Sequence, residues 1–197
     1  MRRRTLAGSF VFLILSVTGA HAKEWQLDKN HSSITFTVKH MVISEVTGRF
    51  DDFSIKFVSE KSDFTDASLE GTIKVNSIDT GNPGRDRHLK TDDFFNAEEY
   101  PEINFKSTSV EKIDEKNYKV TGNLTIRDVT KKVTWDAVLN GTLQSSHGTR
   151  VAWKVTLPIN RFDYGLKWGQ MTEAGGLVAG DIVTITIVGE FVAPSGT

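Results

Sequence analysis

Apolar and polar residues alternate along most of the chain from residue 34 onward, and this period of two predicts β-strands with one buried face. In the first clear run, Ile34, Phe36 and Val38 lie on one side and Thr35 and Thr37 on the other. Similar runs follow down to the end of the chain. The alternation predicts eight strands, at residues 34–40, 53–57, 69–76, 103–110, 118–127, 133–140, 151–159 and 182–191.

The connections between these runs are mostly short and polar, as at residues 114–117, which favours antiparallel pairing of neighbouring strands. Eight antiparallel strands with one apolar face suit either a closed barrel or a β-sandwich. An eight-stranded barrel is just wide enough to be filled by side chains or to hold one small ligand. The pattern therefore predicts one all-β domain and leaves open what fills its interior.

Residues 78–105 interrupt the alternation, because turn residues at 81–84 and 100–101 bracket a stretch too polar for a buried strand. We predict one short helical segment around residues 85–97 that closes one end of the strands. Its acids Asp92 and Asp93 suit a solvated helix start. Phe94 and Phe95 must bury, either as a plug in the core or as part of a ligand's wall.

The N-terminal residues 1–22 have the form of a secretory signal peptide. Three arginines precede an apolar run at residues 6–17, and a small-x-small sequence ends at Ala22. The apolar run is shorter than the roughly 20 residues that a membrane span needs. We predict export to the periplasm with cleavage near Ala22, which leaves residues 23–197 as a single β-barrel binding domain without stable insertion into the membrane.

The predicted mature chain has no cysteine and a mild negative charge. The full sequence has 24 Lys and Arg and 25 Asp and Glu, and removing the three N-terminal arginines leaves 21 against 25, a net charge of −4. This balance argues against nucleic acid and anionic membrane surfaces as partners. The absence of cysteine excludes disulfides, zinc–thiolate sites and cysteine nucleophiles, so packed apolar area must supply the stability.

Few residues carry the signature of a catalytic or metal site. The four histidines after residue 22 lack the spacings that place two imidazoles on one metal, so we expect no metal. Asp86 and His88 offer an acid–base pair, but no nucleophile motif or phosphate-binding glycine loop accompanies them. We expect neither catalysis nor a cofactor.

Two polar residues stand where strands would meet the mouth of a barrel. His40 ends the apolar face of the first strand and is either a rim histidine with one hydrogen bond or a contact for a ligand's polar head. Arg161 follows the seventh strand and either pairs with Asp163 in a weak salt bridge or reaches such a head. The loop at residues 165–180 carries five glycines and Trp168, which suits either a gate for an apolar ligand or simple packing.

Several motifs follow one another in order and together resemble one family. They are D-x-x-H-S-S-I-T-F-T-V-K-H from Asp28, R-D-R-H-L from Arg85, F-F-N-A-E-E-Y-P-E-I-N-F from Phe94, and I-N-R-F-D-Y-G from Ile159. This arrangement resembles the YceI-like family of bacterial periplasmic proteins over essentially the whole chain after residue 22. The resemblance implies an eight-stranded, lipocalin-like antiparallel barrel whose interior binds a polyisoprenoid chain or an isoprenoid quinone. One departure is Asp128, where the family usually has glycine, although aspartate tolerates turn geometry.

The alternation and the resemblance together predict a carrier or sequestering protein for one small amphiphilic lipid. We expect a monomer or homodimer with transient contact to a membrane or membrane protein. The expected apolar wall consists of Phe36, Val38, Phe53, Ile55, Ile73, Leu89, Phe94, Phe95, Phe105, Leu124, Ile126, Trp135, Trp153, Ile185 and Ile187. The expected contacts for the polar head are His40, Arg85, His88 and Arg161.

Two other functions remain open at this point. One is a hydrolase or isomerase that acts on the bound lipid through Asp86 and His88. The other is an interaction partner of a membrane cytochrome, and this function predicts an interior packed solid with aromatic side chains.

Overall fold

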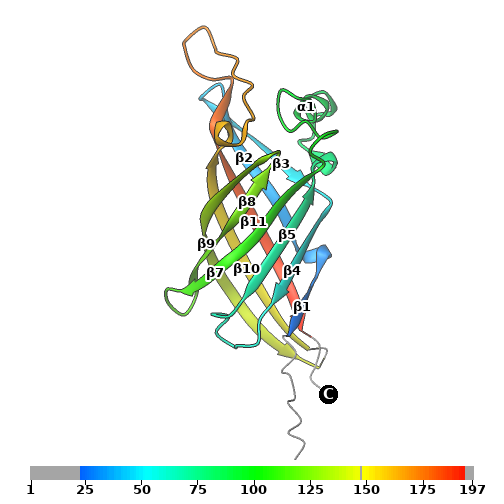
Figure 1. Ribbon diagram of the computed structural model, residues 1–197, viewed down its shortest axis with the longest axis vertical. Helices are drawn as coiled ribbons and strands as arrows, with labels where there is room; N and C mark the ends of the chain where they lie inside the picture. Colours follow the sequence, from blue (N-terminus) through cyan, green and yellow to red (C-terminus); the bar gives the residue numbers. More distant parts are fainter. Residues whose placement is uncertain (1–22, 147, 194–197) are drawn as a thin grey trace, which may run out of the picture.

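The computed structural model describes residues 23–146 and 148–193, so the predicted signal peptide lies outside the described residues. Eleven strands form one antiparallel sheet, which closes on itself because the first strand pairs with the last (Figure 1). The predicted all-β fold, a closed antiparallel barrel, is confirmed. One α-helix and three short 3₁₀-helices complete the elements of the described chain.

The elements have the following bounds. The strands are β1 Glu24–Leu27, β2 Ser33–His40, β3 Ser44–Phe50, β4 Phe53–Val58, β5 Ser68–Lys74, β6 Ile78–Asp79, β7 Glu102–Lys112, β8 Asn117–Ile126, β9 Val129–Ser145, β10 Gly148–Asn160 and β11 Ala179–Ala193. The helices are α1 Pro83–Leu89 and the 3₁₀-helices η1 Lys29–His31, η2 Val75–Ser77 and η3 Arg161–Tyr164.

Three positions in the ring are each occupied by two consecutive short strands. β1 and β2 both pair with β11, on either side of η1. β4 and β3 pair with β1 and β2, across a bend at residues 51–52. β5 and β6 pair with β4 and β3 in turn, with η2 between them. Counted by position, the barrel therefore has the eight antiparallel strands that the alternation predicted.

The strand bounds differ from the prediction where side chains give no alternating signal. β1 and β6 are very short, and the inward face of β3 contains Gly48, which has no side chain. The sixth predicted strand ends at Asn140, but β9 continues to Ser145. Trp153 pairs with Leu139 and Ala152 with Gly141, so Asn140 is the extra residue of a β-bulge rather than the start of a turn.

The wall of the barrel lacks one strand pairing at the end that carries α1. β6 pairs only with β3 among the described strands, whereas β7 pairs with β5 and β8. The segment at residues 80–101, which includes α1, occupies this end of the barrel (Figure 1). The Asn82 side chain begins the helix by accepting hydrogen bonds from the backbone N–H groups of Gly84 and Arg85.

The predicted helical segment at residues 85–97 is too long. The helix ends at Leu89. The chain then turns back on it, because the Phe95 and Ala97 backbone N–H groups donate to the Leu89 and Lys90 carbonyls. Asn96 adopts left-handed backbone with φ 48°, which a regular helix cannot include.

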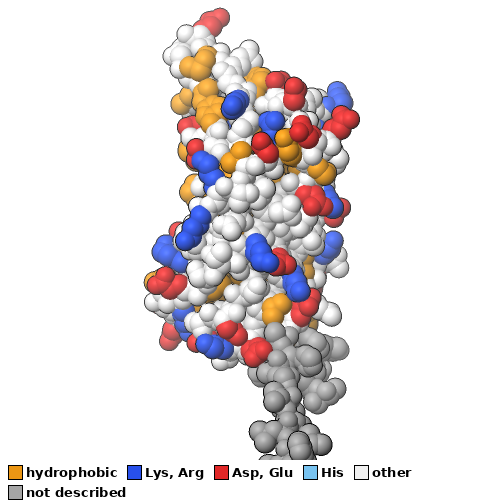
Figure 2. Space-filling model, in the orientation of Figure 1, with side chains coloured by type: hydrophobic (Ala, Val, Ile, Leu, Met, Phe, Trp, Pro, Cys, Tyr) orange, Lys and Arg blue, Asp and Glu red, His pale blue; other side chains and the backbone are white. Residues whose placement is uncertain are grey.

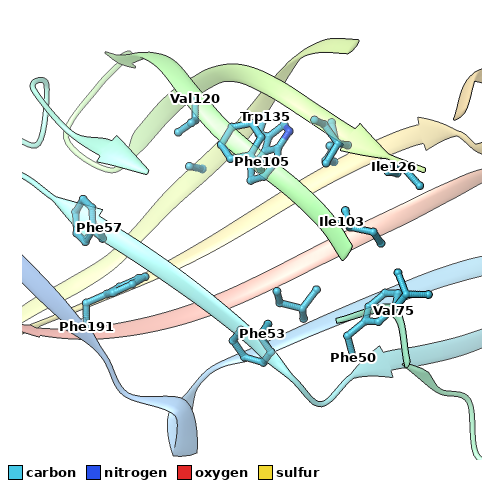
Figure 3. Packing of buried hydrophobic residues seen from close by; sticks show 14 of the residues in the cluster. Phe50, Phe53, Phe57, Val75, Ile103, Phe105, Val120, Ile126, Trp135 and Phe191 are labelled. Atoms are coloured by element: carbon cyan, nitrogen blue, oxygen red, sulfur yellow. The ribbon is translucent and has the colours of Figure 1, made fainter. Parts of the chain in front are cut away.

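Aromatic rings pack closely against two glycines of the barrel wall. Gly48 pairs with Phe36, and a Cβ atom at Gly48 would lie 2.3 Å from the Phe36 ring. A Cβ atom at Gly122 would lie 2.4 Å from the Phe105 ring, which stacks on Trp135 with 3.9 Å between ring centroids. Figure 3 shows this stacked pair inside the barrel. The glycines thus leave space for large rings within a narrow barrel.

The end of the barrel opposite α1 is filled by an aromatic cluster. Phe64, from the loop between β4 and β5, packs against the rings of Trp25, Phe57 and Trp153. Phe191 adds an edge contact to Phe57 with 5.0 Å between centroids. All but Trp153 are buried. This aromatic plug closes one end, so any interior space lies between it and the α1 end.

Candidate functional site

The interior of the barrel contains a cavity of about 350 Å³. This volume falls within the ordinary range of small-molecule sites. All predicted wall residues except Phe53 line it, and so do all four predicted polar contacts. Further lining residues include Val46, Phe64, Ile103, Val120, Val155, Leu166, Trp168, Val178 and Val183. The lining is therefore almost entirely apolar, with its charged side chains limited to a few positions.

Several inward-facing side chains are only partly buried although they lie inside the barrel. Phe36, Ile55, Val155 and Ile185 belong to this group. They line the cavity, whereas core residues that pack against other side chains in the same strands, such as Phe53, are almost fully buried. The interior is thus hollow in its middle, contrary to the solid aromatic packing expected of a filled-core interaction protein.

Phe53 is the one predicted wall residue that does not line the cavity. It pairs with Ile73, so the two side chains share a face of the sheet, and it is 7 % exposed. Figure 3 shows it among the packed core residues. The alternation correctly predicted that the Phe53 side chain points inward, but it could not show that neighbouring side chains separate it from the cavity.

Sequence reasoning missed lining residues outside the regular runs. Phe64 lies in a loop and adopts φ 56°, so no periodic signal predicts its inward direction. Val178 and Ala179 line the cavity just before an irregularity in β11 that shifts its register against β2. Counting back from Val183 in steps of two reaches Ala179 but not Val178, and it passes through the charged Asp181, so the sequence gives no apolar alternation here.

Arg85 and Asp86 both bind Thr80. The Arg85 Nε and Nη2 atoms donate to the Thr80 hydroxyl and carbonyl oxygens at 2.8 Å each. The Asp86 carboxylate accepts from the Thr80 hydroxyl at 2.6 Å and from its backbone N–H at 2.9 Å. These bonds fasten α1 to the chain that follows β6, so both charged groups already have partners within the wall.

His88 bonds with Asp93 rather than with Asp86. Its Nε2 atom lies 2.8 Å from the Asp93 carboxylate. The His88 ring also makes edge contacts to Phe94 and Trp168, with centroids 5.1 Å and 5.5 Å apart. Residues two apart on a helix point in different directions, which explains why the acid–base pair of Asp86 and His88 does not form.

Arg161 is almost completely buried and holds both ends of the loop at residues 165–178. Its three guanidinium nitrogens donate to the backbone carbonyls of Leu166, Ala179 and Gly180 at 2.6–2.9 Å. Burial lowers the pKa of Arg161 from its ordinary value. Of the two alternatives for Arg161, the salt bridge with Asp163 is not found among the described residues, where Asp163 pairs with Lys131 at 3.1 Å.

Arg127 joins the two segments that close the α1 end. Its Nη1 atom donates to the carbonyls of Asp92, Phe94 and Gly165 at 3.0–3.3 Å. The ring of Phe94 lies beside that of Trp168, with centroids 5.6 Å apart. The Trp168 backbone N–H also donates to the Asp93 carbonyl at 3.3 Å, so the closure rests on aromatic contacts, one backbone hydrogen bond and the carbonyl contacts of two arginines.

His40 differs from the other basic side chains that line the cavity. Arg85, His88 and Arg161 have the partners given above, and Lys39 pairs with Glu45 at 2.7 Å. No side-chain hydrogen bond of the His40 ring is found within the described part of the chain, where only its backbone carbonyl accepts, from the Ser44 hydroxyl. Its ring is thus a hydrogen-bonding group at the cavity that the described protein leaves unused.

One group of side chains has ligand atoms close enough for a metal, away from the cavity lining. Asp28, His31 and Glu190 offer atoms within 4.8 Å of one another. Arg150 already donates to both carboxylates, and this contact is the main reason that the pKa of Asp28 is lowered, with His31 second. The cluster is therefore a charge-balanced ion-pair network rather than a strong candidate for metal binding.

Among the described residues, no helix has the length and apolar character needed to cross a membrane. A family model described as the YceI-like domain matches residues 25–191. UPF0312 protein SA2479 of Staphylococcus aureus is 37% identical over 166 residues, which cover 83% of this chain and 94% of that protein.

Solved structures share the fold. The Campylobacter jejuni YCEI protein has a TM-score of 0.68 and 31% sequence identity, covering 88% of this chain and 99% of the other. A polyisoprenoid binding domain from Saccharophagus degradans, implicated in plant cell wall breakdown, has a TM-score of 0.63 and 17% identity, covering 88% of this chain and all of the other.

Proposed function

The chain belongs to the YceI-like domain family, and we propose that it is a binding protein that holds one polyisoprenoid or isoprenoid-quinone-like amphiphile inside its barrel. The observation that carries this proposal is the almost wholly apolar cavity inside the barrel, between the aromatic plug and the α1 end. The polyisoprenoid binding domain with the same fold supports the choice of ligand class.

The lining favours a long apolar chain over a polar small molecule. An isoprenoid tail has almost no hydrogen-bonding capacity, so side chains such as Phe36, Val155 and Ile185 satisfy it completely. Each 100 Å² of apolar surface removed from water contributes about 2.5 kcal/mol. Several such contributions are needed to exceed the roughly 4–15 kcal/mol cost of association, and a ligand buried on all sides can supply them.

The polar head lies at the α1 end in this proposal, with His40 as its first contact. His40 has ring nitrogens that can donate or accept, and the described protein does not use them. Arg85, His88 and Arg161 also line this end and remain predicted head contacts, although each also bonds to the protein. A head group that offers both an acceptor and a donor would suit such an end.

Binding without catalysis is the function that these contacts support best. Asp86 and His88 have separate partners, so the acid–base pair required by the hydrolase or isomerase alternative is not assembled. We also propose that the protein works in the periplasm, on the basis of the signal peptide expected at residues 1–22. It would exchange its ligand through transient contact with a membrane or a membrane protein.

Native mass spectrometry of protein purified from its natural host tests this function. We expect a co-purified lipid in roughly one-to-one amount, released under denaturing conditions and identifiable by its mass. We also expect delipidated protein to take up one equivalent of an added isoprenoid quinone. Bare protein that also takes up neither a polyprenol nor a quinone would remove the proposal.

A further inference from the structure

Two loops at the α1 end form an exposed apolar tip, which we define as Met41, Val42, Ile43 and Met171. The first three residues form the turn between β2 and β3, and Met171 lies in the loop before β11. Ile43 is 89 % exposed, Val42 67 %, Met171 55 % and Met41 46 %. Figure 2 shows hydrophobic side chains gathered toward this end of the molecule.

The backbone of this tip is strained, and it is joined to the second loop. Met41 and Val42 have φ angles of 49° and 69°, in the left-handed region that a β-branched residue rarely adopts. The Met41 backbone N–H donates to the Val178 carbonyl at 2.9 Å, which joins the turn to the second loop. A Cβ atom at Gly176 would lie 2.7 Å from the Val42 side chain, so glycine permits this close contact. The two loops therefore present one surface.

The tip continues directly into the lining of the cavity. Lys39 and His40 line the cavity and precede the turn, while Val178 and Ala179 line it just after the second loop. A chain that leaves the cavity at this end would emerge beside the tip. The tip thus lies where a lipid ligand would have to pass if it came from a bilayer.

The charges around the tip favour an apolar contact over an electrostatic one. The turn itself carries no charge, and the flanking Lys39 and Glu45 neutralise each other at 2.7 Å. The second loop has one charge of each sign, Lys167 and Glu173. In the turn and the second loop, positive charges therefore do not outnumber negative ones, and these two segments offer no basic cluster to select anionic lipids.

Two other exposed apolar residues lack this arrangement. Ile113 is 51 % exposed but stands between Lys112 and Asp114, and Leu143 is 63 % exposed on the outer part of β9. A single exposed apolar residue is ordinary on a protein surface, whereas a contiguous group beside a ligand cavity marks a site of interaction. Ile113 and Leu143 therefore provide matched controls.

We propose that the apolar tip inserts into the interface of a lipid bilayer, so that the ligand passes between membrane and cavity at the α1 end. This inference rests on the proposed lipid-binding function and adds the surface and the membrane type. Insertion depends on Val42, Ile43 and Met171 and requires no anionic lipid.

Co-sedimentation of the protein with phosphatidylcholine vesicles at low and high salt tests the proposal. We expect binding that is insensitive to salt and that falls on the order of 100-fold in the double variant Val42→Ser, Ile43→Ser, at about tenfold for each side chain withdrawn from the apolar phase. The control variant Ile113→Ser, Leu143→Ser should bind like the unchanged protein. Failure of the unchanged protein to bind, or equal binding by both variants, overturns the proposal.

Two further measurements separate this proposal from its premise. Titration with a detergent-solubilised polyprenol should show equal affinity for the tip variant and the unchanged protein. If no protein binds the polyprenol, the proposed function fails. If only the tip variant loses polyprenol binding, the tip belongs to the cavity wall and membrane docking is overturned. Self-association without vesicles that the tip substitutions abolish would assign the surface to a second copy instead.

Discussion

Enlarging a side chain inside the cavity should stabilise the protein and at the same time exclude its ligand. Val155 is suited to this change because it lines the cavity and is only partly buried, and it pairs with Ala137, whose small side chain lies on the same face. We predict that Val155→Phe places the new ring in the empty space. The matched control is Val138→Phe, since Val138 is on the outer face of the neighbouring strand and is 37 % exposed.

The size and sign of the change in unfolding free energy depend on whether the interior is hollow. Phenylalanine adds roughly three to four methylene equivalents, and at about 0.8 kcal/mol each their burial contributes at most about 3 kcal/mol. Restricting the new side chain and incomplete contact reduce this gain, so we expect about 1 kcal/mol of added stability in the ligand-free protein. In a filled interior, the same change would instead cost about 1–3 kcal/mol through overpacking.

Urea denaturation of delipidated protein measures the change in unfolding free energy, and titration with an isoprenoid quinone measures affinity. We expect the ring at position 155 to weaken binding by at least about tenfold, because it occupies space that the tail requires. The control should leave stability within about 0.5 kcal/mol and affinity unchanged. A destabilised Val155→Phe protein that still binds the quinone normally would falsify the hollow-barrel reasoning.

Three further substitutions test individual contacts. His40→Ala should weaken quinone binding about three- to tenfold at constant melting temperature, as expected for one hydrogen bond; unchanged affinity would remove His40 from the site. Gly122→Ala should lower the free energy of unfolding in urea denaturation by about 1–3 kcal/mol, because its Cβ would lie 2.4 Å from the Lys106 carbonyl oxygen and the Phe105 ring. The control Gly141→Ala should change it little, because no atom lies within 4 Å of a Cβ there. Equal effects of the two substitutions would refute the close-packing argument. The lowered pKa of Asp28 means that its pairing with Arg150 stabilises the fold above the ordinary aspartate pKa and that this stability is lost as pH falls through the lowered value. Asp28→Asn should therefore flatten the decline in melting temperature below about pH 4, the ordinary value, and an unchanged slope would count against the ion pair.

The sequence predicted best what the period of two determines. Residues such as Phe36, Leu124 and Ile185 face the interior as the alternation indicated, because a shift by one residue would expose a whole strand's apolar side chains. The number of strand positions was also predictable. The cavity was not, since alternation gives the direction of a side chain and says nothing about whether others fill the space in front of it. Phe53 is the example, because it faces inward and is covered.

The sequence predicted contacts at the α1 end less well, since those contacts depend on how distant segments meet. Asp163 stands two residues from Arg161 and was one possible partner, yet the guanidinium donates to the carbonyls of Leu166, Ala179 and Gly180. The helix was expected to include residue 97 because the polar segment has no strand pattern. Its actual end depends on backbone hydrogen bonds to Leu89 and Lys90 that composition does not encode. Phe64 lies in a loop where no periodicity exists.

β6 and β7 do not pair, so the hydrogen bonds that stabilise the fold differ from the contacts that close this part of the wall. Everywhere else in the ring, parting two neighbours would break a ladder of backbone hydrogen bonds, and folding stability would fall with it. Here the segment at residues 80–101 takes the place of a strand ladder. It is held to the rest of the wall by Arg127, which donates to the carbonyls of Asp92 and Phe94, and by the Trp168 backbone N–H, which donates to the Asp93 carbonyl. Opening the wall between β6 and β7 would leave every pair of hydrogen-bonded strands intact. The rates of ligand entry and release can therefore vary between related proteins, or be engineered, without a matching change in melting temperature.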